Sequence, residues 1–226
     1  MMEHRKKTAI ILGATGLTGN TLLHLLLEDV RYETIKLFSR KSVNISSDKI
    51  VEHIGDILDL AGFKPEFNAK EVFCCIGTTK LKTPDRKLYR RIDFGIPVEA
   101  ARMCKANGID ALIVISAIGA DPNSRVFYNR VKGEMEEEVL RTGVSRTHIL
   151  QPSLISGHRK ERRLGEWMAK QLFKVFDVIL VGPLKKYRSV DPEEIAKCML
   201  QLANKAHESG RISSHEIKKM AKGDRN

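Results

Sequence analysis

The chain has 226 residues, of which 42% are hydrophobic and 30% are charged. This length suits one α/β domain with a large core, and two full domains would be cramped. No stretch approaches the roughly 18 apolar residues that a membrane helix needs, so we expect no membrane span.

The cysteines and the N-terminus both bear on the cellular compartment. Cys74, Cys75, Cys104 and Cys198 show neither metal-ligand spacing nor a disulfide framework. We interpret them as reduced core residues in a reducing compartment, with no metal site; a redox role is the alternative. The basic Arg5–Lys7 precedes an apolar run, but glycines soon break that run and no small-residue cleavage site follows. These features predict a cytoplasmic protein.

The net charge of +11 is unevenly distributed. From His158 to the end, 16 Lys/Arg stand against 9 Asp/Glu, which gives +7. A basic final third could favour anionic substrates, phosphates or nucleic acid, and a solvated basic surface is the simpler alternative. Aromatic interleaving and nucleic-acid-binding motifs are missing there, so we expect no specific nucleic-acid partner.

Short apolar runs alternate with helical patterns along the chain. We expect strands at Thr8–Leu12, Thr34–Ser39, Lys49–His53, Glu71–Ile76, Ala111–Ser116 and Arg146–Leu150. We expect helices at Leu17–Glu28, Asp85–Ala106, Val126–Arg141, Leu164–Asp177 and Pro192–Lys205, the last one capped by Asp191. Continuous apolar strands suit a parallel sheet that is covered on both faces. The alternation predicts an α/β fold, a Rossmann-type doubly wound parallel sheet with helices on both faces.

The end of the chain, residues 207–226, is polar, and we expect one short helical piece there at most. We find no linker, so residues 1–226 should form a single Rossmann-type domain. Little chain follows the sixth strand, and the substrate region should be small and built from loops from about residue 153 onward.

The first expected strand runs directly into a glycine-rich loop, and the first helix opens within it. Gly13 allows a tight turn, Gly16 lets the backbone approach a pyrophosphate, and Gly19 lets the helix pack close to the strand. A diphosphate would lie at the helix N-terminus, where N–H groups and the dipole favour an anion. We therefore expect Gly13, Thr15, Gly16, Leu17 and Gly19 to bind a dinucleotide; glycines that merely shape a turn are the alternative.

The end of the second strand bears on the form of the cofactor. An NAD site usually carries Asp or Glu there, to hold the ribose 2′-hydroxyl. This chain has Arg40 and Lys41 instead, and a basic side chain can pair with a 2′-phosphate. We therefore expect NADP(H); a basic pair at an exposed strand end is the alternative.

A Ser-Tyr-Lys trio carries the strongest chemical signal. Tyr128 and Lys132 are four residues apart on an expected helix and share a face, and Ser116 ends the fifth strand. An ammonium beside a phenol lowers the pKa of the phenol, which makes proton exchange easier. We expect Tyr128 to donate a proton, Lys132 to tune it and Ser116 to hold a substrate oxygen; an incidental Tyr/Lys pair is the alternative.

These features resemble the short-chain dehydrogenase/reductase superfamily, in its atypical branch and closest to the Tat-interacting-protein subfamily. The matching stretches are G-x-x-G-x-x-G at Gly13–Gly19, Cys74–Thr79, Gly119–Asp121, Tyr128-x-x-Val-Lys132-Gly-Glu134 and Gly165–Trp167. The resemblance covers most of the chain and implies NADPH binding. It also implies, from animal members, regulatory roles with protein partners.

The resemblance assigns further residues. It implies that Asp56 touches the adenine, although Asp56 would be equally at home as a turn residue. It implies that the loop at Gly77 and Thr78 closes over the adenine ribose and diphosphate; the alternative for the Thr78 and Thr79 hydroxyls is that they cap the turn. It also implies that Pro152 packs by the nicotinamide. Lys132 would also hold the nicotinamide ribose.

The chain departs from the family pattern at two places. Some family members carry a further Asn on the preceding helix, near the position of Asp93 in this chain. The alternative is that Asp93 is a surface or helix-packing residue. The subfamily has Arg-Pro-Gly where this chain has Gln151-Pro-Ser153. The family places its substrate cover at the basic segment His158–Arg163. This segment could steer an anionic substrate, and a solvated loop is the alternative. Trp167 should be a packing anchor.

Two functions follow from these residues. The first is an NADPH-dependent oxidoreductase that reduces a small carbonyl compound, which could be anionic, with Tyr128 as the proton donor. The second is an NADP(H)-sensing regulatory protein, in which the bound cofactor orders a surface for a protein partner. Turnover of NADPH with a carbonyl would distinguish them.

Overall fold

The computed structural model describes residues 6–156 and 189–223, and these residues form an entirely parallel sheet of seven strands. The strands are β1 (Lys7–Leu12), β2 (Tyr32–Ser39), β3 (Ile50–Ile54), β4 (Glu71–Cys74), β5 (Ala111–Ile115), β6 (Arg146–Gln151) and β7 (Gly210–Ser213). Their order across the sheet is β3-β2-β1-β4-β5-β6-β7. The order reverses between β1 and β4, and in such sheets ligands bind beyond the carboxyl ends of the strands at this point.

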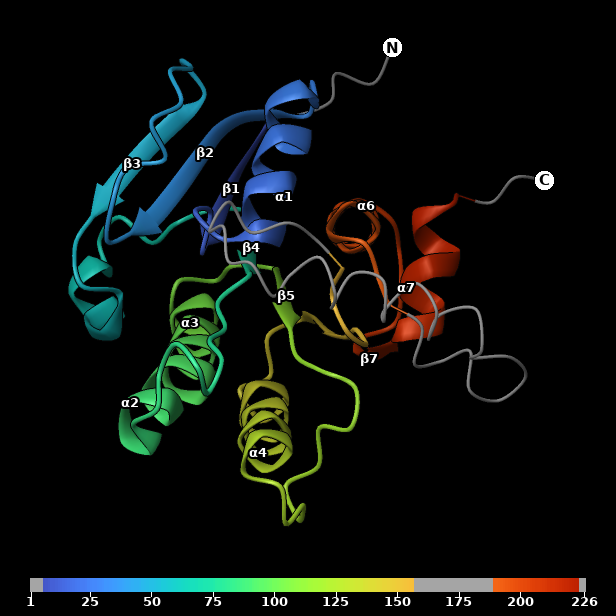
Figure 1. Cartoon of the computed structure of the whole chain (residues 1–226). Coiled ribbons are helices and arrows are strands. Elements are labelled where there is room, and N and C mark those ends of the chain that lie inside the picture. The colour runs from blue at the N-terminus through green and yellow to red at the C-terminus, as the bar shows by residue number, and fades with distance from the viewer. Residues whose placement is uncertain (1–5, 157–188, 224–226) are drawn as a thin grey trace, which may run out of the picture.

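Helices cover both faces of the sheet (Figure 1). One face packs against α1 (Leu17–Glu28), α6 (Pro192–Asn204) and α7 (Ser214–Ala221). The other face packs against α3 (Ile96–Ala106), α4 (Phe127–Arg141) and the short helix η1 (Ile57–Phe63). The predicted fold class is confirmed.

Burial explains why the apolar runs form the central strands. Every residue of β4 and β5 is buried, because helices cover both of their faces. The six expected strands and four of the expected helices lie within two residues of their observed bounds, apart from the interruption described next. The fifth expected helix, Leu164–Asp177, lies outside the described residues.

The expected helix Asp85–Ala106 has three parts. A short α2 (Arg86–Arg90), capped by the Asp85 carboxylate, leads into a π-helical turn, η2 (Arg91–Gly95), and then into α3. A π turn holds one residue more than an α turn, so it shifts the side chains that follow relative to an unbroken α-helical pattern.

The end of the chain is more structured than its polarity suggests. Besides α7 it contributes β7, which pairs in parallel with β6 from His148 to Gln151. Only Ile212 is buried in this four-residue strand, so the strand has almost no apolar pattern from which it could be predicted. The expected short helical piece is present as α7, whereas the strand β7 was not expected.

The four cysteines are unpaired, and three of them are fully buried in the core. Of the helices that the structure describes, none is both long and apolar enough to cross a membrane.

Candidate functional site

The glycine-rich loop joins β1 to α1 in a compact turn. Gly13 has a φ of +90°, and its carbonyl accepts the Gly16 N–H at 3.0 Å. A Cβ on Gly19 would lie 2.2 Å from the Gly13 oxygen, so only glycine lets α1 begin this close to the end of β1. No side chain of the described chain caps α1 at Gly16. The loop therefore leaves an uncapped helix N-terminus, a geometry that fits a diphosphate; Thr15 is exposed on it and Leu17 is half-buried.

The predicted adenosine residues lie at the carboxyl ends of β2 and β3. Arg40 and Lys41 directly follow β2, and both are exposed. Asp56 follows β3, and its carboxylate accepts the Leu58 N–H at 3.0 Å, which caps η1. The structure therefore gives Asp56 the turn role that the sequence left open, and its contact with adenine stays a prediction.

Gly77 and Thr78 lie next to the predicted catalytic helix. A Cβ on Gly77 would be 3.7 Å from Asp93 Oδ1 and 4.0 Å from Lys132 Nζ, both ordinary contacts. The protein's own packing therefore does not require glycine here, which is consistent with selection for a close approach by a bound group. The Thr78 N–H donates to Asp93 Oδ2 at 2.8 Å, and the Thr78 hydroxyl pairs with that of Thr83.

Lys132 forms a buried ion pair that the sequence did not indicate. Its Nζ lies 2.9 Å from Asp93 Oδ1, and the two side chains are 4% and 1% exposed. The pKa of Lys132 is raised, because the attraction of Asp93 and the effect of Tyr128 outweigh the penalty of burial. Asp93 is thus a buried partner of Lys132, not a surface residue.

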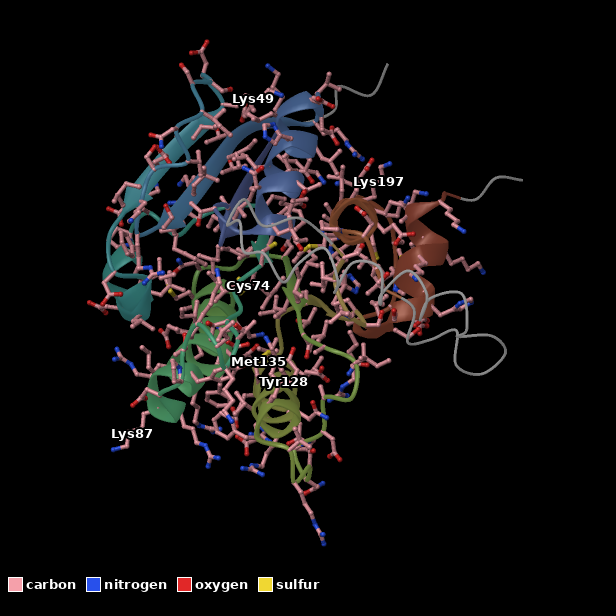
Figure 2. The ribbon with its side chains drawn as sticks, viewed as in Figure 1. Lys49, Cys74, Lys87, Tyr128, Met135 and Lys197 are labelled. Atoms are coloured by element: carbon pink, nitrogen blue, oxygen red, sulfur yellow. The ribbon has the colours of Figure 1, made fainter. Side chains whose placement is uncertain are left out.

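Tyr128 lies on α4 (Figure 2), one helical turn before Lys132 on the same face, and its ring contacts that of Tyr89 on α2. Burial raises the pKa of Tyr128; the Lys132 ammonium opposes that shift, and the Asp93 carboxylate reinforces it. The sequence predicted a lowered pKa, and the net direction is the opposite. The main reason is burial, which outweighs the effect of the Lys132 ammonium, and the Asp93 carboxylate adds to it.

Ser116 belongs to a second buried cluster. Its hydroxyl donates to Glu136 Oε1 at 2.5 Å, and Glu136 is fully buried on α4. The same carboxylate accepts from Gln151 Nε2 at 2.9 and 3.0 Å and from Arg211 Nε at 2.6 Å. In this arrangement the Ser116 proton is directed to Glu136, and only the lone pairs of the hydroxyl remain for another group.

Sequence reasoning missed Glu136, although a signal was present. Glu136 lies four residues after Lys132, so Tyr128, Lys132 and Glu136 repeat on one face of α4. Arg211 could not have been found in this way, because β7 was not expected.

The strand ends hold the loops around these residues. The carbonyl of Pro152, which is buried directly after β6, accepts the Ile118 N–H at 2.8 Å and so ties down the loop after β5. A Cβ on Gly133 would lie 2.2 Å from the Pro122 nitrogen, so glycine lets α4 lie directly against that loop. The remaining predicted residues, His158–Arg163 and Trp167, lie outside the described part of the chain.

Tyr128 opens onto a pocket of about 480 Å³, and its side chain is 38% exposed. The Tyr89 and Tyr128 rings meet edge to face, with their centroids 6.5 Å apart. The Arg86 guanidinium lies over the Phe127 ring, 5.3 Å from its centroid. The lining residues are Thr78, Thr79, Lys80, Thr83, Pro84, Arg86, Tyr89, Val126, Phe127 and Tyr128. The pocket is therefore walled by aromatic rings and carries two cationic side chains.

Comparison with known proteins finds clear relatives, although no family model matches the chain. Protein FMP52 of Candida glabrata is 34% identical over 162 residues, which cover 71% of this chain and 69% of that protein. Protein HTATIP2 of Rattus norvegicus is 31% identical over 173 residues, which cover 75% and 71%.

A solved structure with a similar fold is the Bordetella bronchiseptica enzyme WbmG in complex with NAD. It matches with a TM-score of 0.69 and 12% identity, over 98% of this chain and 78% of that chain. At this identity the likeness concerns the fold alone, and it agrees with the Rossmann-type sheet.

The relatives correct the expected compartment. FMP52 proteins of several fungi are named mitochondrial, which contradicts the expectation of a cytoplasmic protein. Reduced cysteines fit any reducing compartment, so they do not single out the cytoplasm.

The glycine-rich loop, the Rossmann-type sheet and relatives above 30% identity lead to one assignment. The chain belongs to the atypical short-chain dehydrogenase/reductase family of NAD(P)-binding oxidoreductases, together with HTATIP2 and FMP52.

Proposed function

We propose that this protein is an NADPH-dependent reductase of a small carbonyl compound, with Tyr128 as the proton donor. The observation that carries the proposal is that the phenol of Tyr128 opens onto the pocket while buried Lys132 lies one turn further along the same helix. A proton donor at the wall of a pocket is where a carbonyl reductase needs it.

The choice of NADPH rests on Arg40 and Lys41. Both cations are exposed at the end of β2, and neither has a carboxylate partner among the residues that the structure describes. Charge-assisted hydrogen bonds to a 2′-phosphate are open to them, whereas neither can accept a hydrogen bond from a ribose 2′-hydroxyl.

The pocket favours a small substrate with an apolar body and an anionic group. Tyr89, Phe127 and Tyr128 supply aromatic walls, and Lys80 and Arg86 supply positive charge without a carboxylate partner among the described residues. We propose that the protein has neither a specific nucleic-acid partner nor a membrane partner.

In the mechanism, the glycine-rich loop would hold the diphosphate and Lys132 would hold the nicotinamide ribose. Pro152 would pack beside the nicotinamide. The bound cofactor supplies the hydride. Tyr128 protonates the oxygen of the reduced carbonyl and recovers its proton from solvent through the open pocket. Ser116 would orient that oxygen once its hydroxyl turns away from Glu136.

The experiment is turnover of NADPH with a panel of small carbonyls, with and without a carboxylate, followed by Tyr128→Phe. This substitution removes one hydroxyl and keeps the ring, so NADPH affinity should stay nearly unchanged. Reduction should fall about 100-fold or more, the usual contribution of a positioned proton donor. Phe127→Leu, on the same pocket wall, controls for altered packing. Wild-type turnover by Tyr128→Phe would remove Tyr128 from the mechanism.

A second candidate function is an NADP(H)-sensing protein that binds a protein partner without turnover. The observation in its favour is that Ser116 and Lys132 are both engaged by buried carboxylates, Glu136 and Asp93. Tight NADPH binding without consumption across the whole carbonyl panel would favour this function.

A further inference from the structure

The π-helical turn η2 places a carboxylate at the centre of the candidate site. Asp93 lies within this turn and is fully buried. One of its oxygens faces Lys132 Nζ at 2.9 Å, and the other accepts the Thr78 N–H at 2.8 Å. Asp93 therefore joins two elements of the site, α4 and the loop after β4. π turns inside α-helices often occur at functional sites.

The charged and titratable groups around Tyr128 come from three directions. Lys132 faces it from α4, Asp93 from η2, and Tyr89 from α2. Lys80 and Arg86 share its pocket. Lys132 is the buried cation of this set, and its charge is matched by the buried charge of Asp93. The ammonium that would otherwise favour a Tyr128 phenolate is thus balanced by its own partner.

We propose that Asp93 is a positioning residue that balances the charge of Lys132, keeps Tyr128 protonated and so adapts the site to carbonyl reduction rather than alcohol oxidation. This inference rests on the proposed function. In reduction, the carbonyl carbon accepts a hydride from the bound cofactor, which becomes oxidised, and the oxygen takes the Tyr128 proton. The resulting phenolate takes a proton from solvent. The reverse reaction needs Tyr128 as a phenolate base, and burial together with the Asp93 carboxylate makes that form scarce.

Asp93→Asn is the sharpest variant for a test. The asparagine keeps the size of the side chain and an oxygen that can accept the Thr78 N–H, and it removes only the charge. Glu99→Gln is the matched control, because it removes a carboxylate from α3, where Glu99 pairs with exposed Arg102.

The first measurement follows phenolate formation by ultraviolet absorbance as the pH is raised, without substrate. The chain has four tyrosines, so the Tyr128 signal is taken as the difference between each protein and the same protein carrying Tyr128→Phe. Asp93→Asn should form the Tyr128 phenolate at a clearly lower pH than the wild type, and Glu99→Gln should not differ from it. An unchanged Tyr128 titration in Asp93→Asn would overturn the inference.

Removing one member of a buried ion pair can prevent folding. The double variant Asp93→Asn/Lys132→Met removes both charges and keeps the site neutral. If the two charges balance in the wild type, Tyr128 should titrate in the double variant as it does in the wild type. A titration shifted strongly upward would show that Lys132 acts on Tyr128 unopposed, and the inference would fail.

The second measurement compares the two reaction directions against pH, with a carbonyl and its alcohol. Asp93→Asn should raise the oxidation rate near neutral pH about tenfold, which corresponds to one unit of phenol pKa, and should move the oxidation profile to lower pH. A role in folding alone would lower both directions and leave the profile in place. If no carbonyl is turned over but the titration shifts as expected, the proposed function fails and the charge balance stands.

Discussion

At the residue scale, the partner of each ionisable group decides what that group can do. Tyr128 and Lys132 lie on one face of α4, as their spacing of four predicts. Their partners could not be predicted in the same way. Asp93 reaches Lys132 through a π turn, whose extra residue breaks the helical periodicity, and Glu136 reaches Ser116 across the boundary between α4 and β5. Spacing along a sequence locates residues on a face, whereas pairing across elements depends on the packing.

Arg40 allows a direct test of cofactor choice. Arg40→Ala should weaken NADPH binding by about 1.5–3 kcal/mol, the range for a hydrogen bond to a charged group. NADH affinity should hardly change, because NADH lacks the 2′-phosphate. Calorimetric titration of both cofactors measures this, with exposed Arg102→Ala on α3 as the control. Equal wild-type affinities for the two cofactors, or a loss that is the same for both, would count against the assignment.

At the element scale, continuous apolar runs were sufficient to predict the central strands, because both faces of a parallel sheet are covered. They were insufficient for β7, which buries Ile212 and owes its place to backbone pairing with β6. The glycine-rich loop was predicted in position and in form, because a turn with a positive φ at Gly13 and a close contact at Gly19 both demand glycine.

His148 on β6 should make the stability of this sheet edge depend on pH. Burial, with smaller contributions from the nearby His207 and Arg146, lowers its pKa to about 4. The unfolded chain binds a proton near pH 6.5, whereas the folded chain resists it until about pH 4. The free energy of unfolding should therefore fall as the pH drops from 6.5 towards 4, by at most about 1.4 kcal/mol per pH unit.

Urea unfolding at several pH values between about 4.5 and 7.5 measures this dependence. His148→Leu should reduce the slope of stability against pH in this range, since the buried imidazole is gone. His24→Gln, which removes an exposed imidazole from α1, should keep the wild-type slope. A slope that is the same in His148→Leu and in the wild type would assign the dependence to other groups.

At the scale of the whole molecule, local patterns and global fold agree, which is why the fold class followed from the sequence. Apolar runs, glycines at turns and helix caps all indicated the same doubly wound sheet. The cellular compartment could not be predicted from these patterns, because it depends on targeting and not on packing.

The net charge of +11 belongs to this scale too. We expect DNA binding that is weak and independent of sequence, because the charge attracts phosphates while the chain lacks a recognised groove-reading motif. Two unrelated duplexes of equal length should compete equally in a fluorescence titration, and affinity should fall steeply as salt rises. Selective binding of one duplex at physiological salt would contradict this expectation.

The contact between Arg211 and Glu136 has an evolutionary consequence. The subfamily pattern has an arginine at the position of Gln151, and in this chain the guanidinium that meets Glu136 comes from β7. Ile149 pairs with Arg211 across the two strands, so side chains at 151 and 211 extend from the same face of the sheet towards α4. One cation satisfies the buried carboxylate, and two would leave excess charge inside the protein. Positions 151 and 211 should therefore vary together among relatives, with arginine at one of them but not at both.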